Sequence, residues 1–233
     1  MDLLGSGREA DVYAIDADRV LRRYRRGDDA TGEAELMAYL AGHGYPVPRV
    51  HSADGADMIL DRIDGRTMTE AFAAGELDVD TGAAILVDLH EHLHRLPSRS
   101  GRDRILHRDL HPENVMLTDG GPVVIDWHNA AEGRPEVDVC LTAIIMAQVA
   151  AEPGHPHAAA AGAFLGAFLG AFLSGAGDSL SRAGGPLSKA GGRPLAGLDE
   201  ALDIRRADPA LTAAEAAGLA ATVTPLIYGA LRS

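Results

Sequence analysis

The sequence is poor in cysteine, in lysine and in positive charge overall. Cys140 is the single cysteine among 233 residues, so an internal disulfide is excluded. Lysine occurs only at position 189, and the formal net charge is −13. Such an excess of acidic side chains argues against nucleic acid as a partner and is compatible with a cationic substrate. At this length the chain can form one large domain or two modest lobes with their own cores.

Signals for export and for a membrane anchor are also missing. The first residues contain no basic region followed by an apolar run, so we expect no secretory signal and a cytoplasmic protein. Residues 158–177 are uncharged and carry Gly162, Gly166 and Gly170 in G-x-x-x-G spacing, so a transmembrane helix has to be considered. Only three Phe and three Leu supply the apolar drive, about −2 to −4 kcal/mol on the insertion scale. We therefore expect no membrane partner. The segment is instead predicted to be an internal helix that packs through its Phe and Leu stripe and whose glycines permit close helix approach.

The most informative stretch, residues 107–126, reads HRDLHPENVMLTDGGPVVID. Two short apolar strands, 115–117 and 123–125, flank a Thr-Asp-Gly-Gly-Pro turn and predict a hairpin. Antiparallel pairing places Asn114, before the first strand, beside Asp126, after the second. An amide oxygen and a carboxylate that converge suit magnesium, which prefers oxygen ligands and keeps several waters. The sequence therefore predicts Asn114 and Asp126 as metal ligands.

Asp109 lies five residues before Asn114, on the loop that leads into this hairpin. A carboxylate there can orient a hydroxyl and receive its proton. His107-Arg108-Asp109 with Asn114 matches the H-x-D-x-x-x-x-N catalytic loop of the protein-kinase-like superfamily, and Asp126 stands where kinases have Asp-Phe-Gly. The form HRDLHPEN resembles the aminoglycoside phosphotransferase family, the small-molecule kinase branch of that superfamily. By this resemblance Asp109 is the predicted catalytic residue.

The resemblance implies an α+β, two-lobed protein-kinase-like fold. Residues 1–65 would form a nucleotide-binding lobe of antiparallel strands with one helix, and residues 66–233 a mainly helical catalytic and substrate lobe. Outside the resemblance, residues 174–194 are rich in Gly, Ser and Pro and predict a flexible loop. ATP or another nucleoside triphosphate, with Mg²⁺, would give its γ-phosphate to a hydroxyl of a small molecule, aminoglycoside-like or another amino alcohol. The short segment between residues 126 and 138 leaves no room for a peptide platform.

A glycine turn, Gly5-Ser6-Gly7, separates the first two predicted strands. Glycines let backbone amides approach a phosphate closely, without a Cβ in the way. Turn statistics alone favour a plain hairpin. The resemblance implies a nucleotide-covering loop, abbreviated relative to the G-x-G-x-x-G of protein kinases.

Residues 19–24 predict a third strand, on which Val20 and Arg22 share one face. In the family template V-A-I-K both positions face the nucleotide, so Arg22 replaces the usual lysine. The helix predicted over 31–41 places Glu33 on its inward stripe. An acidic side chain there needs a partner, and Arg22 is the predicted one, similar to the strand-to-helix ion pair of kinases.

Residues 49–53 and 56–60 flank Asp-Gly and predict a further hairpin. By resemblance, the segment that follows is the hinge between lobes, where the carbonyl of Asp61 and the amide of Ile63 would bond the adenine.

Another pattern favours different chemistry. His90-Glu91-His92-Leu93-His94, in the helix predicted over 81–96, matches the H-E-x-x-H of zinc proteases. His107 or His111 could supply a third ligand. A histidine-rich chain also produces such short matches by accident, so the zinc hydrolase is the weaker alternative.

Asp138 opens an almost wholly apolar helix at 139–150. The resemblance implies that it bonds the catalytic-loop backbone, and a simple N-cap role is the other interpretation. Near the C-terminus, Asp199, Glu200, Asp203 and Asp208 either meet a cationic substrate or lie on solvated helix faces. The replacement of lysine by Arg22 and the short glycine loop leave a second function open, a catalytically degenerate nucleotide-binding regulator. The acceptor and the oligomeric state stay open.

Overall fold

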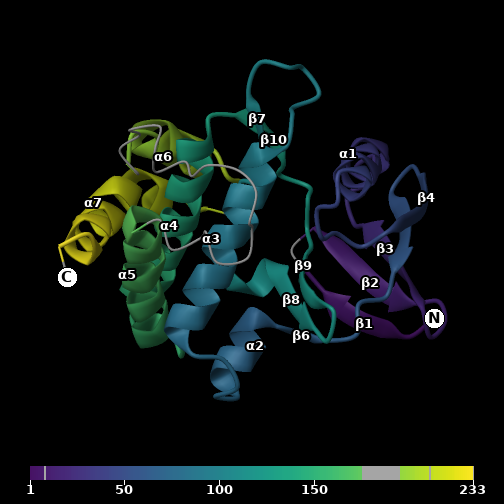
Figure 1. Cartoon of the computed structure of the whole chain (residues 1–233), viewed down its shortest axis with the longest axis horizontal. Helices are drawn as coiled ribbons and strands as arrows, with labels where there is room; N and C mark the ends of the chain where they lie inside the picture. Colours follow the sequence, from purple (N-terminus) through teal and green to yellow (C-terminus); the bar gives the residue numbers. More distant parts are fainter. Residues whose placement is uncertain (8, 175–194, 210, 233) are drawn as a thin grey trace. The chain divides into compact units, whose positions relative to one another are not determined.

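The computed structural model describes residues 1–7, 9–174, 195–209 and 211–232 (Figure 1). The chain forms two compact units, one of residues 1–67 with 114–128 and the other of residues 68–113 with 129–233. The lobe boundary at residue 65 stays a prediction, because the first unit also takes in the 114–128 hairpin. The flexible loop predicted at 174–194 lies outside the described residues from 175 onward.

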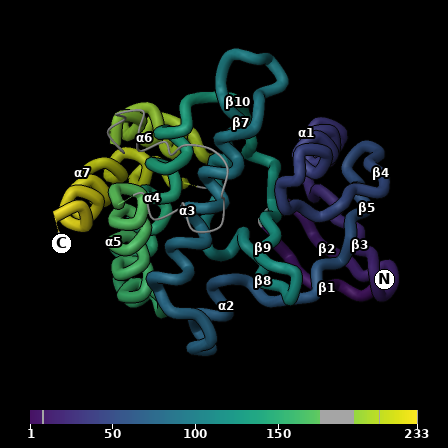
Figure 2. Tube along the Cα trace, in the orientation of Figure 1, coloured from purple at the N-terminus to yellow at the C-terminus, as the bar shows by residue number. Residues whose placement is uncertain are grey.

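The first unit is built on a five-stranded antiparallel sheet in the order β1-β2-β3-β5-β4. The strands are β1 (Leu3–Ser6), β2 (Ala10–Ala14), β3 (Arg19–Tyr24), β4 (Val50–Asp54) and β5 (Asp57–Asp61). Helix α1 (Thr31–Gly42) contacts β4, and the Cα trace of Figure 2 follows these elements in chain order. Alternation along β3 buries Val20 and Arg22 on one face, and the helical period buries Glu33 on α1, as predicted.

A second small sheet of this unit carries the catalytic-loop hairpin. Strands β8 (Val115–Thr118) and β9 (Gly121–Val124) pair antiparallel as predicted, and β6 (Arg66–Thr67) adds to β8. The Val124 N–H donates to the Pro46 carbonyl at 2.8 Å, which ties the hairpin to the loop before β4. Gly65 permits the approach of β6, since a Cβ there would lie 2.3 Å from the Leu117 carbonyl oxygen.

The second unit is mainly helical. Its helices are α2 (Met68–Ala73), α3 (Val79–Arg95), α4 (Pro135–Ala151), α5 (Ala158–Ser174), α6 (Leu198–Arg206) and α7 (Ala213–Ala230), with a short η1 (Pro112–Asn114) at the unit boundary. Strands β7 (Arg104–Leu106) and β10 (Ala131–Gly133) pair beside them. Helix α4 packs against α3, α5, α6 and α7, which explains why its sequence is apolar on every face.

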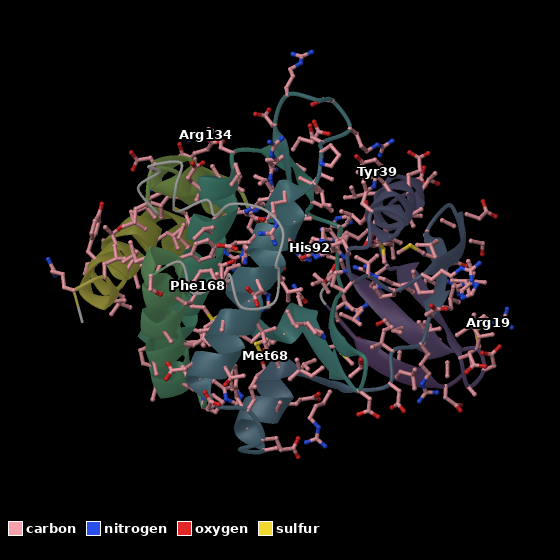
Figure 3. The ribbon with its side chains drawn as sticks, in the orientation of Figure 1. Arg19, Tyr39, Met68, His92, Arg134 and Phe168 are labelled. Atoms are coloured by element: carbon pink, nitrogen blue, oxygen red, sulfur yellow. The ribbon has the colours of Figure 1, made fainter. Side chains whose placement is uncertain are left out.

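Helix α5 is the uncharged segment, and it packs inward through Phe164, Leu165, Phe168 and Leu169. Phe168 is labelled in Figure 3. Its ring lies against His90 of α3, with centroids 5.5 Å apart. The predicted role of its glycines is wrong at two of three positions. Among the residues that the structure describes, a Cβ on Gly166 or Gly170 would meet nothing within 4 Å, and of these three glycines only Gly162 approaches a neighbour, the Ala150 Cβ at 3.8 Å. None of the described helices has the length and apolar character needed to cross a membrane.

Helix ends follow local capping rules. Thr212 and Glu215 form a capping box at the start of α7. Asp78 caps α3 by accepting the Thr81 N–H, and the helix begins at Val79, two residues before the predicted start. The N-cap interpretation of Asp138 is wrong, because α4 begins at Pro135 and Asp138 lies inside its first turn. Its carboxylate is therefore available for other partners.

Candidate active site

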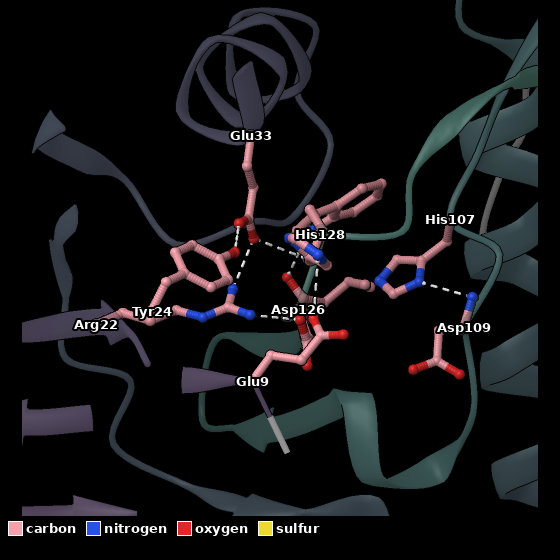
Figure 4. A network of polar contacts seen from close by, with 10 residues as sticks. Glu9, Arg22, Tyr24, Glu33, His107, Asp109, Asp126 and His128 are labelled. Atoms are coloured by element: carbon pink, nitrogen blue, oxygen red, sulfur yellow. Dashed lines mark hydrogen bonds and ion pairs between the residues drawn. The ribbon is translucent and has the colours of Figure 1, made fainter. Parts of the chain in front are cut away.

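Arg22 on β3 bridges two carboxylates of the first unit (Figure 4). Its Nη1 lies 2.6 Å from Glu33 Oε1, and its Nη2 lies 2.5 Å from Asp126 Oδ1. The Arg22 to Glu33 pair is the one that the strand and helix periods predict; the contact with Asp126 was not predicted. Burial lowers the pKa of Arg22, but the charges of Asp126 and Glu33 outweigh it and raise the pKa above its usual value. The guanidinium is therefore a permanent cation between two anions.

Glu33 has two further donors that the sequence reasoning missed. The Trp127 N–H donates to Oε1 at 3.0 Å, and the Tyr24 hydroxyl bonds Oε2. The Tyr24 ring also lies 5.0 Å from the Arg22 guanidinium carbon, within cation–π range. The signal was present in the strand alternation, because residues 22 and 24 of one strand point to the same face.

Asn114 and Asp126 lie at the open end of the hairpin, as predicted, but with a shift of one residue. Val115 pairs with Val124, so the Ile125 N–H donates to the Asn114 carbonyl at 3.0 Å and Asp126 is the next residue. Asp126 has φ 63°, a left-handed backbone that costs a non-glycine residue energy and is typical of functional positions.

The donor set at this end fits a hard cation. Asp126 already faces one cation, the Arg22 guanidinium, and an amide and a carboxylate are oxygen ligands of the kind Mg²⁺ accepts. No group of three or more His, Cys, Asp or Glu in the described part of the chain is arranged to hold a metal. Mg²⁺ bound here would keep water or phosphate oxygens as its other ligands.

The glycine turn is a closed hairpin turn. The Gly7 N–H donates to the Ala10 carbonyl at 2.9 Å, and the Ser6 hydroxyl donates to Asp11 Oδ1 at 2.8 Å. Gly5 is exposed and a Cβ there would meet no atom within 4 Å. The nucleotide-covering role of Gly5, Ser6 and Gly7 stays a prediction. Near the turn, Glu9 Oε2 lies 3.1 Å from His128 Nε2.

The other predicted nucleotide residues lie along β3 and β5. Val20 is buried and pairs with Leu60. Asp61 ends β5, its side chain 2.7 Å from His51 Nε2, and Ile63 is half-buried just beyond the strand. Their contacts with a nucleotide base stay predictions.

Asp109 belongs to the second unit, where its N–H donates to His107 Nδ1 at 3.2 Å (Figure 4). Its Oδ1 lies 3.6 Å from His111 Nε2. Burial raises the pKa of Asp109, but hydrogen bonding and charge from His111, with the charges of His107 and Arg205, lower it overall. The carboxylate is ionised near neutral pH and can accept a proton.

Asp138 binds the backbone of the loop that carries Asp109. One Asp138 oxygen accepts the Arg108 N–H at 2.7 Å, and the other accepts the His107 N–H at 3.0 Å and contacts His94 Nε2 at 2.9 Å. Burial raises the pKa of Asp138, but the His94 contact and these amides lower it overall. The backbone contact that the resemblance implied is therefore present, and the His94 contact was missed.

The histidines of the H-E-x-x-H match have other partners. His90 Nδ1 lies 2.9 Å from the Leu86 carbonyl and its Nε2 lies 3.2 Å from the Thr142 hydroxyl, while His94 faces Asp138. His90 is fully buried. These contacts join α3 to α4 and do not favour a zinc site.

Three of the four acidic side chains near the C-terminus contact arginines. Glu200 lies 2.6 Å from Arg134, and the other two pairs, each at 2.8 Å, are Asp203 with Arg206 and Asp208 with Arg205. The Glu200 and Asp203 pairs lie at the surface and favour the solvated-face interpretation for these two residues, whereas the Asp208 pair is mostly buried.

The model of the phosphotransferase enzyme family, APH, matches residues 2–98 and 64–175 of this chain. A search of curated proteins by sequence finds no match. The fold is similar to that of the gentamicin complex of APH(2'')-IIa, with TM-score 0.57 and 13% identity over 99% of this chain and 89% of that one. Amicoumacin kinase hAmiN, in complex with AMP-PNP and Ca²⁺, gives TM-score 0.56 and 15% identity over 98% and 88%. Plasmodium vivax ethanolamine kinase gives TM-score 0.54 and 10% identity over 72% and 67%.

These likenesses confirm the predicted α+β, protein-kinase-like fold. The matched family segments together cover residues 2–175, well over half of the chain. These segments include Arg22 and Asp126, which contact each other, and the loop that Asp138 binds. The chain belongs to the phosphotransferase enzyme family.

Proposed function

We propose that the protein transfers the γ-phosphoryl group of ATP, or of another nucleoside triphosphate, to a hydroxyl group of a small molecule. Family membership supports phosphotransfer. The observation that carries the proposal is the Arg22 guanidinium, which contacts both Glu33 and Asp126. This permanent cation lies beside Asp126, the proposed metal ligand, where the negative charge of a phosphate group has to be neutralised.

The first unit supplies the nucleotide and metal residues of the proposal. Arg22 offers a planar fork of donors to phosphate oxygens, in place of the single ammonium of a lysine. Asn114 and Asp126 would hold Mg²⁺, which supplies neutralisation of phosphate charge. The glycine turn at 5–7 and the end of β5 would contact the triphosphate and the base.

The second unit supplies the residue that handles the acceptor. Asp109 orients the acceptor hydroxyl and takes its proton as the hydroxyl oxygen bonds to the γ-phosphorus. The bond from that phosphorus to the bridging oxygen breaks, and the nucleoside diphosphate leaves with the electron pair. Because Asp138 holds the His107 and Arg108 amides, the loop is fixed before substrate binds.

Two observations support a small-molecule acceptor, the length of one segment and the names of the similar structures. Only eight residues separate Asp126 from Pro135, the start of α4, so this segment is too short for a peptide platform. The similar structures are named for gentamicin, amicoumacin and ethanolamine, all small molecules. We therefore infer a small hydroxylated acceptor, aminoglycoside-like or another amino alcohol.

A pair of isosteric variants tests this function. A panel of small alcohols is screened for acceptor-dependent nucleotide consumption, and the best acceptor is assayed with Asp109→Asn and Asp126→Asn. Asp109→Asn should lower the rate of phosphoryl transfer at least about a hundredfold, the usual contribution of a general base. Its nucleotide affinity should stay as in wild type. Asp126→Asn should weaken Mg²⁺-dependent nucleotide binding. Asp119→Asn, on the exposed hairpin turn, is the matched control.

The second candidate function makes a different prediction in the same assay. A nucleotide-binding regulator, suggested by Arg22 in the lysine position, would bind nucleotide without transfer to any acceptor. Near-full turnover in Asp109→Asn would contradict the catalytic assignment of this residue.

A further inference from the structure

Tyr24 is an uncharged residue that contacts Arg22, Glu33 and His128. Its hydroxyl bonds Glu33 Oε2, its ring lies 5.0 Å from the Arg22 guanidinium, and the same ring lies 5.1 Å from His128. Burial, followed by the charge of Glu33, raises the pKa of the Tyr24 phenol, so the hydroxyl stays protonated and serves as a donor. Figure 4 shows the tyrosine between Arg22 and Glu33.

The network has more negative than positive charge. Arg22 is one cation, and it faces the carboxylates of Glu33 and Asp126. Glu33 has neutral donors as well, the Tyr24 hydroxyl and the Trp127 N–H. Asp126 is nearly half exposed, at 45% of its side chain. The Tyr24 hydroxyl, a neutral donor, replaces the Arg22 guanidinium only in part as a partner of Glu33. The hydroxyl also fixes the rotation of the Glu33 carboxylate so that Oε1 faces Arg22.

Loss of the Tyr24 hydroxyl frees the Glu33 carboxylate to rotate. The Oε1 contacts with Arg22 and Trp127 then lose their alignment, and Arg22 shifts toward its other anion, Asp126. Arg22 Nη2 already lies 2.5 Å from Asp126 Oδ1, so the nitrogen released from Glu33, Nη1, would turn to the second Asp126 oxygen and compete with any cation that uses it. The Tyr24 hydroxyl on β3 therefore affects how tightly Asp126, 102 positions later, binds a cation.

We propose that Tyr24 is a positioning residue that holds Arg22 on Glu33 and thereby keeps Asp126 available to Mg²⁺. This inference rests on the proposed function, since it takes Asp126 as a metal ligand. The role differs from packing, because it predicts a defect that excess Mg²⁺ reverses. A packing defect would not respond to the metal.

The test measures metal dependence by binding, apart from activity. Affinity for AMP-PNP is determined by calorimetry at a series of free Mg²⁺ concentrations, for wild type, Tyr24→Phe and Tyr39→Phe. Tyr39, half-buried on α1 with its ring beside His43, gives the matched loss of a hydroxyl. We expect Tyr24→Phe to raise the Mg²⁺ concentration for half-maximal affinity about three- to tenfold, with affinity at saturating Mg²⁺ within twofold of wild type. Tyr39→Phe should leave the midpoint unchanged.

A second variant tests whether Tyr24 acts through Glu33. Glu33→Gln removes the anion that competes for Arg22, so it should raise the Mg²⁺ midpoint as well. Adding Tyr24→Phe to Glu33→Gln should then produce no further shift in the midpoint. Emission from Trp127, the single tryptophan, adds a spectroscopic readout beside Asp126.

The outcomes separate this inference from the proposed function. If wild type binds AMP-PNP without Mg²⁺ dependence, the metal assignment fails. If wild type shows that dependence and Tyr24→Phe has the same midpoint, the positioning role is overturned. A loss of affinity in Tyr24→Phe that saturating Mg²⁺ does not restore would show a packing role only, and it too overturns the proposal.

Discussion

The Asp138 carboxylate accepts a hydrogen bond from the His107 N–H at 3.0 Å, although the two residues are 31 positions apart. The same side chain accepts the Arg108 N–H and contacts His94. A buried anion with three partners holds the loop that carries Asp109 against α4 and α3. The shape of this loop therefore depends on one side chain that no substrate needs to touch.

Asp138→Asn should be among the most damaging changes in the chain. The asparagine side chain lacks the negative charge that His94 faces. Its NH₂ group is a donor, and it would face a backbone N–H, which is also a donor. We expect a loss of about 2–4 kcal/mol in the free energy of unfolding, measured by urea denaturation, and a larger loss of turnover than of nucleotide affinity. Asp199→Asn, on the exposed face of α6, is the control. Wild-type stability in Asp138→Asn would contradict the structural role given to this carboxylate.

His90 should make stability depend on pH. Burial, with smaller contributions from His94 and His107, lowers its pKa from 6.5 to about 4, although Asp138 opposes the shift. Between pH 6.5 and 4 the unfolded chain binds a proton that the folded chain does not, so stability falls as pH falls through this window. The full shift corresponds to about 3 kcal/mol. Thermal or urea unfolding between pH 7 and pH 4.5 measures it.

His90→Asn provides the control for this pH dependence. The asparagine amide can still donate to the Leu86 carbonyl, which His90 Nδ1 contacts at 2.9 Å, but it has no proton to take up in this range. The variant should be less stable at pH 7 and should show a flatter profile from pH 7 to 4.5. An equally steep profile would assign the effect to another group.

Two glycine variants should have opposite effects on stability. Gly166→Ala, in the middle of α5 where a Cβ meets no atom within 4 Å, should add about 0.5–1 kcal/mol, because alanine is the better helix former. Gly65→Ala places a Cβ 2.3 Å from the Leu117 carbonyl oxygen, so it should cost about 1–3 kcal/mol. If Gly166→Ala instead lowers stability, a neighbouring helix must approach α5 closely at this glycine, contrary to the structure.

Arg22 variants test the departure from lysine. Arg22→Ala removes the cation between Glu33 and Asp126 and should cost both stability and turnover. Arg22→Lys restores the residue typical of the family but loses the fork that reaches two carboxylates. We expect turnover to fall within about tenfold, or about 1.4 kcal/mol of transition-state stabilisation. A gain in turnover would favour the degenerate regulator, and unchanged affinity and turnover in Arg22→Ala would place this arginine outside the site.

The protein should hold no stoichiometric zinc. His90 and His94 have hydrogen-bond partners on α3 and α4, so a metal would have to break buried contacts before binding. Elemental analysis after dialysis checks this expectation. One zinc ion per chain would revive the hydrolase alternative.

Local patterns were sufficient for the elements of the first unit. The β3 strand, the inward face of α1 and the β8–β9 hairpin follow from periods and turn residues, and the Arg22 to Glu33 pair follows from two periods combined. The hairpin end was misplaced by one residue because Ile125 is apolar like the strand before it, yet its N–H already bonds the Asn114 carbonyl. An apolar pattern does not reveal where the backbone leaves the strand.

Contacts made by tertiary packing were out of reach of such patterns. The close helix approach predicted for Gly166 and Gly170 required knowledge of which face of α5 meets a neighbour. The His94 to Asp138 pair joins two helices whose relative rotation no periodicity fixes. The Tyr24 to Glu33 bond was closer to hand, since Tyr24 shares a strand face with Arg22, but an aromatic residue there is normally assigned to the core.

The positive φ angles of Asp126 (63°) and Arg108 (66°) have a consequence for laboratory evolution of this protein. Glycine adopts that backbone without strain, and Arg22 keeps Glu33 as its partner when Asp126 is replaced, so a screen that rewards heat resistance alone would favour Asp126→Gly and Arg108→Gly. The first of these variants discards the proposed metal carboxylate. Lineages selected only for resistance to heat should therefore drift toward well-folded chains without phosphotransfer, and a screen for useful stabilised variants has to score acceptor phosphorylation in every round.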